Sequence, residues 1–149
     1  MQQMNIKLTA KQAYCSMIDY LEKYYFNTYA NDIGDLLGGM LFLPSGKTAD
    51  AAAWNDWIRA IDKMKQSQSI QNNTEDLLTI TQSYESMINF LENYADLAQS
   101  EETRILLDQK MLIKNEQPLD QKNWNDWINS VEKILKQDPL ILPPFVLLK

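Results

Sequence analysis

An internal repeat with an offset of 70 residues is the strongest constraint on how this chain of 149 residues can fold. Leu8-Thr9 recurs as Leu78-Thr79, and Trp54-Asn55-Asp56-Trp57-Ile58 recurs as Trp124-Asn125-Asp126-Trp127-Ile128. Because 78 − 8 and 124 − 54 both equal 70, the two segments align without a gap. Self-similarity at one fixed offset indicates a duplication. We therefore expect both copies to fold into the same unit.

Each copy opens with the signal of a helix start. Thr9 and Thr79 each stand three residues before a glutamine, which is the Thr-x-x-Gln pattern of a capping box. Large apolar residues follow at spacings of three and four, and this spacing places them on one face of a helix. We expect a first helix near residues 10–29 and its copy near 80–98.

Two further helices are expected in each copy. Apolar residues at helical spacing indicate a second helix over 32–41 and its copy over 101–112. Asp50 and Asp120 are suitable N-caps for a third helix, which carries the Trp-x-x-Trp pair. The sequence therefore predicts an all-α protein, in which two similar three-helix units form one compact helical body.

The limits of the two units follow from composition. We place the first helical unit at residues 1–66 and the second at 78–137. Between them, the polar segment 67–77 predicts a linker. The apolar tail, 138–149, contains three prolines and cannot be one helix. So apolar a tail should either pack back on the body or meet a partner.

The large side chains of the first and third helices are the predicted structural core. A pair of tryptophans at positions i and i+3 could instead form an aromatic binding surface, but its duplication favours the core. The predicted core residues are Tyr14, Met17, Leu21, Trp54, Trp57, Tyr84, Met87, Leu91, Trp124 and Trp127.

The residues needed for common catalytic chemistry are scarce. The chain has no histidine, so no imidazole is available for proton transfer or metal ligation. Its single cysteine, Cys15, excludes a disulfide framework and is expected to be an ordinary thiol on a helix. Pairs such as Asp19 with Glu22 could act in acid–base catalysis only if a pocket moved their pKa values apart. We expect no enzyme, no metal and no cofactor.

The charge of the chain bears on its partners. Twenty acidic residues against 14 basic ones give a formal net charge of −6. This sign disfavours nucleic acid as a partner, because phosphate contacts need clusters of Lys and Arg, and it suits a basic protein. The start of the chain has no apolar signal region, and the apolar run 140–148 is too short to span a bilayer. We therefore expect a cytoplasmic protein with no membrane contact.

The glycines of the expected second helix are unusual, because each costs about 1 kcal/mol relative to alanine inside a helix. Gly34, Gly38 and Gly39 would fit a helix end, a close helix crossing or a place where the backbone of a partner approaches. The second copy has Arg104, Asp108 and Gln109 at these places. A binding surface built on the glycines would therefore occur in one copy only.

Three motifs of the first copy occur together in a known module. They are Ala13-Tyr14 with Met17 and Tyr20-Leu21-Glu22, then Asp32-Ile33-Gly34-Asp35-Leu36-Leu37-Gly38-Gly39-Met40, then Trp54-Asn55-Asp56-Trp57. With them the chain resembles small α-helical bacterial immunity proteins of contact-dependent growth inhibition and other polymorphic toxin systems. The resemblance covers most of residues 8–65 and, more weakly, 78–136. It implies binding of a toxin and no catalytic residue.

Two hypotheses follow. In the first, an immunity protein occludes a cognate cationic toxin domain, expected to be a nuclease, with Asp32, Asp35 and Asp56 as the candidate toxin-binding residues. In the second, the chain is a helical scaffold or self-associating module. A hydrolase that uses carboxylates is a third and weaker alternative.

Overall fold

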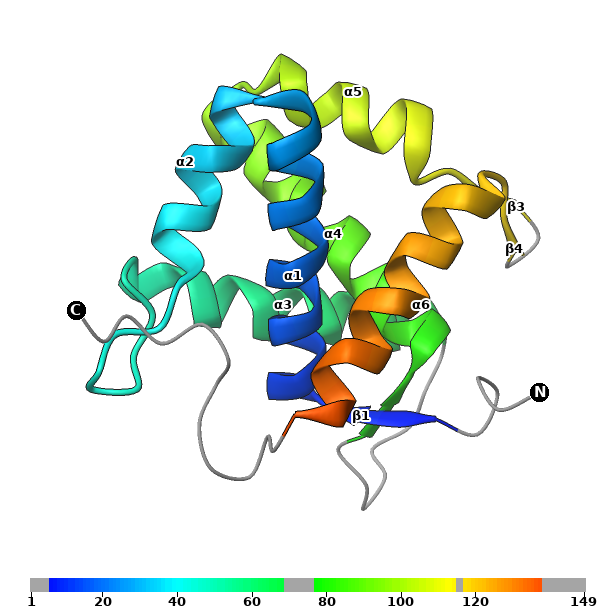
Figure 1. Cartoon of the computed structure of the whole chain (residues 1–149), viewed down its shortest axis with the longest axis horizontal. Helices are drawn as coiled ribbons and strands as arrows, with labels where there is room; N and C mark the ends of the chain where they lie inside the picture. The colour runs from blue at the N-terminus through cyan, green and yellow to red at the C-terminus, as the bar shows by residue number, and fades with distance from the viewer. Residues whose placement is uncertain (1–5, 69–76, 115–116, 138–149) are drawn as a thin grey trace.

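The structure is a computed structural model that describes residues 6–68, 77–114 and 117–137, and the tail 138–149 lies outside these residues. The described residues are mainly helical, as predicted (Figure 1). The helices are α1 (Ala10–Thr28), α2 (Asn31–Met40), α3 (Ala51–Ser67), α4 (Ile80–Ala98), α5 (Glu101–Lys110) and α6 (Gln121–Lys136). Two short antiparallel pairs accompany them: β1 (Lys7–Thr9) with β2 (Leu77–Thr79), and β3 (Ile113–Lys114) with β4 (Gln117–Pro118).

The predicted helix starts are confirmed at atomic detail. In α1 the backbone N–H of Gln12 donates to Thr9 Oγ1 at 3.0 Å, and the N–H of Thr9 donates to Gln12 Oε1 at 2.9 Å. The same reciprocal pair caps α4. Asp50 and Asp120 accept hydrogen bonds from backbone amides of α3 and α6. Equivalent caps therefore fix equivalent helix starts in the two copies.

The pairing of β1 with β2 was not predicted, because three residues are too few for an alternating pattern to stand out. Leu8 pairs with Leu78, its own counterpart. On either side of this pair, Lys7 pairs with Thr79 and Thr9 pairs with Leu77. Such a register is symmetric about the pair of leucines. Both leucines are buried. Strand β2 begins at Leu77 and α3 ends at Ser67, so each takes one terminal residue of the expected linker.

The third helix of each copy packs mainly against the first helix of the other copy. Helix α3 contacts α4 most extensively, and α6 contacts α1 (Figure 1). Trp57 on α3 lies between Tyr14 of its own copy and Phe90 of the other, at ring-centroid distances of 6.2 and 6.1 Å. Its indole Nε1 donates to the backbone oxygen of Ala10 at 2.9 Å. One copy alone therefore leaves its central tryptophan without the ring contact from Phe90.

Most of the predicted core residues are buried, with two exceptions. Tyr14, Met17, Leu21, Trp57, Tyr84, Met87, Leu91 and Trp127 are buried. Trp54 and Trp124 are only partly buried, because each lies at the margin of the core. Their rings cover the buried Tyr14 and Tyr84 at centroid distances of 5.3 and 5.1 Å. In each Trp-x-x-Trp pair, one indole therefore fills the core and the other packs against its margin.

A buried carboxylate joins α1 to α6. Asp19 is 2 % exposed, and its oxygens lie 2.8 Å from Lys133 Nζ on α6 and 3.1 Å from Lys23 Nζ on α1. Burial raises the pKa of Asp19, but its interactions with Lys133, Ser130 and Lys23 together outweigh burial and hold the pKa below its ordinary value. The counterpart, Asn89, is uncharged and donates to the backbone oxygen of Ala60 at 3.2 Å. The α1–α6 and α3–α4 crossings therefore lie at equivalent positions of the two copies, but the first has a buried carboxylate where the second has an amide.

Asp19→Asn, which copies the residue at position 89, should destabilise the fold at neutral pH by about 1–3 kcal/mol, because it removes a buried charged acceptor. Since the pKa of Asp19 is lowered on folding, its stabilisation is present above the ordinary aspartate pKa and is lost as the pH falls through the lowered value. Urea unfolding at pH 7 and near pH 3 should therefore show a difference that shrinks in acid. Asp126→Asn, which breaks the exposed pair with Lys122, should change stability by less than about 0.5 kcal/mol. A difference for Asp19→Asn that does not depend on pH would contradict this assignment.

The exchange of third helices predicts that neither copy folds alone. Two fragments made by dividing the chain between residues 72 and 73 should each show weak helical circular dichroism and no cooperative thermal unfolding. Mixing them should restore the helical signal of the whole chain, because α3 regains α4 and α6 regains α1. Cooperative unfolding of either fragment by itself would show that the exchange is not needed for folding.

Candidate functional site

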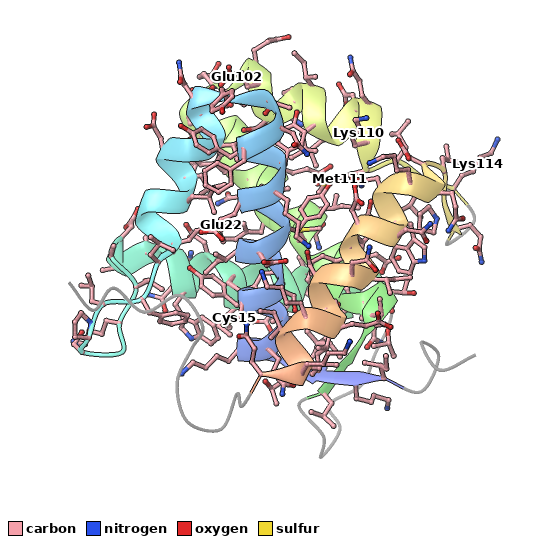
Figure 2. The ribbon with its side chains drawn as sticks, in the orientation of Figure 1. Cys15, Glu22, Glu102, Lys110, Met111 and Lys114 are labelled. Carbon is pink, nitrogen blue, oxygen red and sulfur yellow. The ribbon has the colours of Figure 1, made fainter. Side chains whose placement is uncertain are left out.

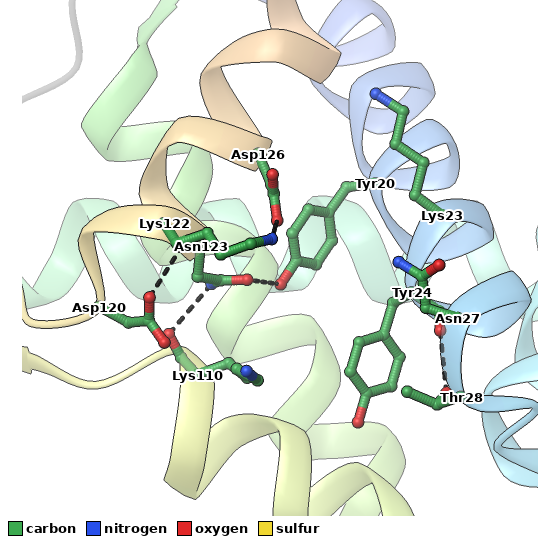
Figure 3. A pocket seen from close by; sticks show the side chains of 10 residues that line it. All are labelled: Tyr20, Lys23, Tyr24, Asn27, Thr28, Lys110, Asp120, Lys122, Asn123 and Asp126. Carbon is green, nitrogen blue, oxygen red and sulfur yellow. Dashed lines mark hydrogen bonds and ion pairs between the residues drawn. The ribbon is translucent and has the colours of Figure 1, made fainter.

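The duplication builds one surface groove twice. In each case the C-terminal half of a first helix faces the beginning of the third helix of the other copy. The acidic groove, between α4 and the α2–α3 region, is lined by Asp35, Leu36, Gly39, Asp50, Ala52, Ala53, Asp56, Phe90, Asn93, Tyr94, Leu97 and Ala98. The mixed groove, between α1 and the start of α6, is lined by Tyr20, Lys23, Tyr24, Asn27, Thr28, Lys110, Asp120, Lys122, Asn123 and Asp126 (Figure 3).

The floor of the mixed groove is a hydrogen-bonded network. Tyr20 OH donates to Asn123 Oδ1 (Figure 3). Asn123 Nδ2 donates to Tyr84 OH at 2.9 Å and to the backbone oxygen of Lys110 at 3.0 Å. Burial raises the pKa of Tyr84 to about 12, so its hydroxyl stays protonated at neutral pH. The groove therefore ends on a satisfied polar network, in which the amide of Asn123 joins the two tyrosines.

The floor of the acidic groove is apolar instead. Phe90 stands where the mixed groove has Tyr20, and Ala53 stands where it has Asn123. Neither side chain can form the equivalent hydrogen bonds. Leu97 replaces Asn27 at the rim and is 75 % exposed. The two copies of the groove thus differ in chemistry from the floor to the rim.

The charges of the two grooves differ as well. The acidic groove has three carboxylates, Asp35, Asp50 and Asp56, and its lining contains no lysine or arginine. Burial raises the pKa of Tyr94 in this lining, and the charges of Asp32, Asp35 and Glu102 raise it further. The mixed groove has three lysines and two aspartates. One groove is therefore negative, and the other holds both signs.

Two of the three carboxylates of the acidic groove also have structural partners. Asp50 caps α3 by accepting from the backbone N–H of Ala52 at 2.9 Å. Asp56 accepts from Arg59 at 2.6 Å on the outer face of α3. Among the residues that the structure describes, Asp35 forms no ion pair. Asp35 is exposed, so it is the carboxylate of this groove most open to a partner.

Of the three candidate toxin-binding residues, Asp35 and Asp56 meet in the acidic groove, and Asp32 lies outside its lining. Asp32 Oδ2 accepts from Ser100 Oγ, the N-cap of α5, at 2.6 Å. In return its backbone N–H donates to Glu102 Oε1 at 2.7 Å. Glu102 is the counterpart of Asp32, and Figure 2 labels it where α2 and α5 begin. The two acidic residues therefore join the N-termini of the second helices to each other.

The glycines of α2 allow close packing. A Cβ at Gly34 would lie 2.7 Å from Tyr25 Cε1, and one at Gly39 would lie 3.0 Å from Asp50 Cβ. None of the three glycines of α2 adopts a positive φ, and Leu41, the residue after the helix, is in extended backbone. The glycines therefore do not form a left-handed helix end. Gly38 faces open space. Close crossing thus accounts for Gly34 and Gly39, and it brings Asp50 against α2 at the edge of the acidic groove.

The other groups with possible chemistry lie apart from both grooves. Burial raises the pKa of the Cys15 thiol to about 12, which keeps it protonated on α1 (Figure 2). Burial and the charge of Asp19 raise the pKa of Glu22, whereas that of Asp19 is lowered, but neither residue lines either groove. Within the described part of the chain no group of three Cys, Asp or Glu side chains is placed to hold a metal ion. No helix of that part is long and apolar enough to cross a membrane.

Sequence reasoning named two acidic members of the acidic groove as candidate binding residues and missed the members on α4, because these come from the other copy. Phe90, Tyr94 and Leu97 lie on α4, and the α2–α3 side belongs to the first copy. A usable signal existed: Leu97 stands on the polar side of its helix where the first copy has Asn27. Comparisons with models of protein families, with curated proteins and with solved structures find no match to this chain.

Proposed function

We propose that this chain is a non-catalytic, immunity-type protein that neutralises a cognate cationic toxin domain by occlusion. The observation that supports the proposal best is the acidic groove, in which three carboxylates stand around an apolar floor with no basic side chain in the lining. A basic protein surface complements such a groove in charge. We propose that the protein uses no cofactor and no metal and that it acts in the cytoplasm.

Charge would contribute to the mechanism in two ways, by occupying the basic face of the toxin and by speeding the encounter. A nuclease needs a basic face to hold the phosphates of its substrate. Carboxylates that occupy this face block the substrate, and the net charge of −6 increases the rate of encounter with a basic partner. Tight binding is enough for protection, so no reaction and no catalytic side chain are required.

The proposal includes the arrangement of the two units. Asp35, Asp50 and Asp56 come from the first copy, and Phe90 and Leu97 come from the second. We therefore propose that the two three-helix units act as one body with one toxin-binding groove. The mixed groove would then be a structural copy without this role.

Replacement of both Asp35 and Asp56 by asparagine should slow association with the captured toxin domain about tenfold and weaken its dependence on salt, because two negative charges leave the binding face. The partner is obtained by capture of the tagged protein from its native lysate and mass spectrometry, and rates are measured by surface plasmon resonance. The matched control is Asp108→Asn with Asp126→Asn, which removes one exposed and one half-buried carboxylate outside the acidic groove. Equal slowing by both double variants would show that only net charge matters, and would remove the groove from the proposal.

A self-associating scaffold is the second candidate, because two large aromatic residues near the end of α1 are open to solvent. Phe26 is 64 % exposed and Tyr29 is 70 % exposed. This function predicts a dimer whose fraction rises with concentration and falls in Phe26→Ser with Tyr29→Ser. Sedimentation velocity over a hundredfold range of concentration tests it. A monomer throughout that range would count against the scaffold and leave the immunity proposal in place.

A further inference from the structure

Both sides of the acidic groove contribute apolar residues, and its carboxylates all lie on the α2–α3 side. The α4 side carries Tyr94, Leu97 and Ala98 together with Phe90 of the floor. Opposite them, Asp35 lies on α2 and Asp56 on α3. Leu97 is 75 % exposed although it lies beside buried Phe90, so apolar surface is left open to water next to the carboxylates. Such a surface fits a ligand that has an apolar side and a basic side.

The mixed groove shows which side chains would disfavour binding of such a ligand. At the place of Ala52 it has Lys122, whose Nζ lies 3.4 Å from Asp126 Oδ2. At the place of Ala53 it has Asn123, which fills the floor with an amide. The wall that carries Leu97 in one groove carries Asn27 in the other. The same backbone thus presents an apolar, negative groove in one case and a polar groove with its own cations in the other.

We propose that the acidic groove binds a basic amphipathic segment of the partner, with a leucine-sized side chain against Leu97 and Leu36 and a lysine or arginine beside Asp35 and Asp56. The inference rests on the proposed function and specifies the element of the toxin that is recognised. Helices border the groove on both sides, so a helical segment that presents its apolar and basic residues on one face is the fitting shape. Apolar contact supplies affinity, and the carboxylates select against acidic segments.

The duplicate supplies the variant that tests this proposal. Ala52→Lys copies position 122 and places an ammonium four residues before Asp56, as Lys122 stands before Asp126. Ala52 is exposed in the first turn of α3, so the substitution should leave folding intact. Leu97→Asn copies position 27 and removes the apolar anchor from an exposed site. Lys122→Ala, the reverse change in the mixed groove, is the matched control.

The probe is a set of synthetic amphipathic peptides of about five helical turns, roughly 18 residues. One has lysines and leucines on a common face, the second has alanine in place of leucine, and the third has glutamate in place of lysine. Fluorescence anisotropy of labelled peptides at 50 and 150 mM salt measures binding to the full chain and to each variant. Circular dichroism melts verify that every variant is folded.

The Lys/Leu peptide should bind best, and the Lys/Ala and Glu/Leu peptides at least tenfold more weakly. Ala52→Lys and Leu97→Asn should each lower the affinity for the Lys/Leu peptide about tenfold, and Lys122→Ala should change this affinity less than twofold. Equal binding of the Lys/Leu and Lys/Ala peptides, or unchanged affinity in folded Ala52→Lys, would overturn the proposal. If a captured toxin domain binds folded Ala52→Lys as tightly as the native chain, the groove is the wrong site while the immunity function stands. If the peptides behave as expected but no toxin domain is captured from cells that express one, the groove stands and the immunity function fails.

Discussion

Each third helix carries a tryptophan that completes the core of the opposite copy, and the rest of the structure depends on this exchange. Trp57 touches Tyr14 on one side and Phe90 on the other, and Trp127 touches Tyr84 and Tyr20 in the same way. A chain of this length divided into two separate cores would bury a smaller fraction of its surface than one shared core does. By sharing the tryptophans, the two copies bury one continuous core.

The grooves are a consequence of this exchange. When a third helix lies on the first helix of the other copy, its first turns stand opposite the end of that helix. A groove forms there twice, and the residues at its floor are the ones beside the shared tryptophans. Phe90 and Tyr20 contact the indoles, so both positions remain aromatic. Only the hydroxyl of Tyr20 distinguishes them, and that hydroxyl requires the acceptor supplied by Asn123.

Local signals in the sequence predicted the helices well, because each has a periodic apolar face and the first and third helices of both copies also have a side-chain cap. Thr9, Thr79, Asp50 and Asp120 mark helix starts that need no tertiary contact to be recognised. The exchange of helices and the pairing of Leu8 with Leu78 were not predictable, because spacing says nothing about which copy a helix packs on. Asp32 was chosen for its place beside the glycines, yet its carboxylate contacts Ser100, 68 residues away. The acidic groove was predicted only in part for the same reason. Its carboxylates Asp35 and Asp56 were named, but its α4 side comes from the second copy and was not.

The copies are constrained most where a residue meets its own counterpart. Leu8 pairs with Leu78, and the backbone N–H of Asp32 donates to Glu102, so a change in one copy must suit the other. Residues of the grooves meet no counterpart: Ala52 and Lys122, or Leu97 and Asn27, face separate surfaces. They can differ without disturbing the shared core. Positions that meet their own counterparts are therefore constrained by the shared core, whereas the groove positions, which do not, are free to differ in charge and polarity.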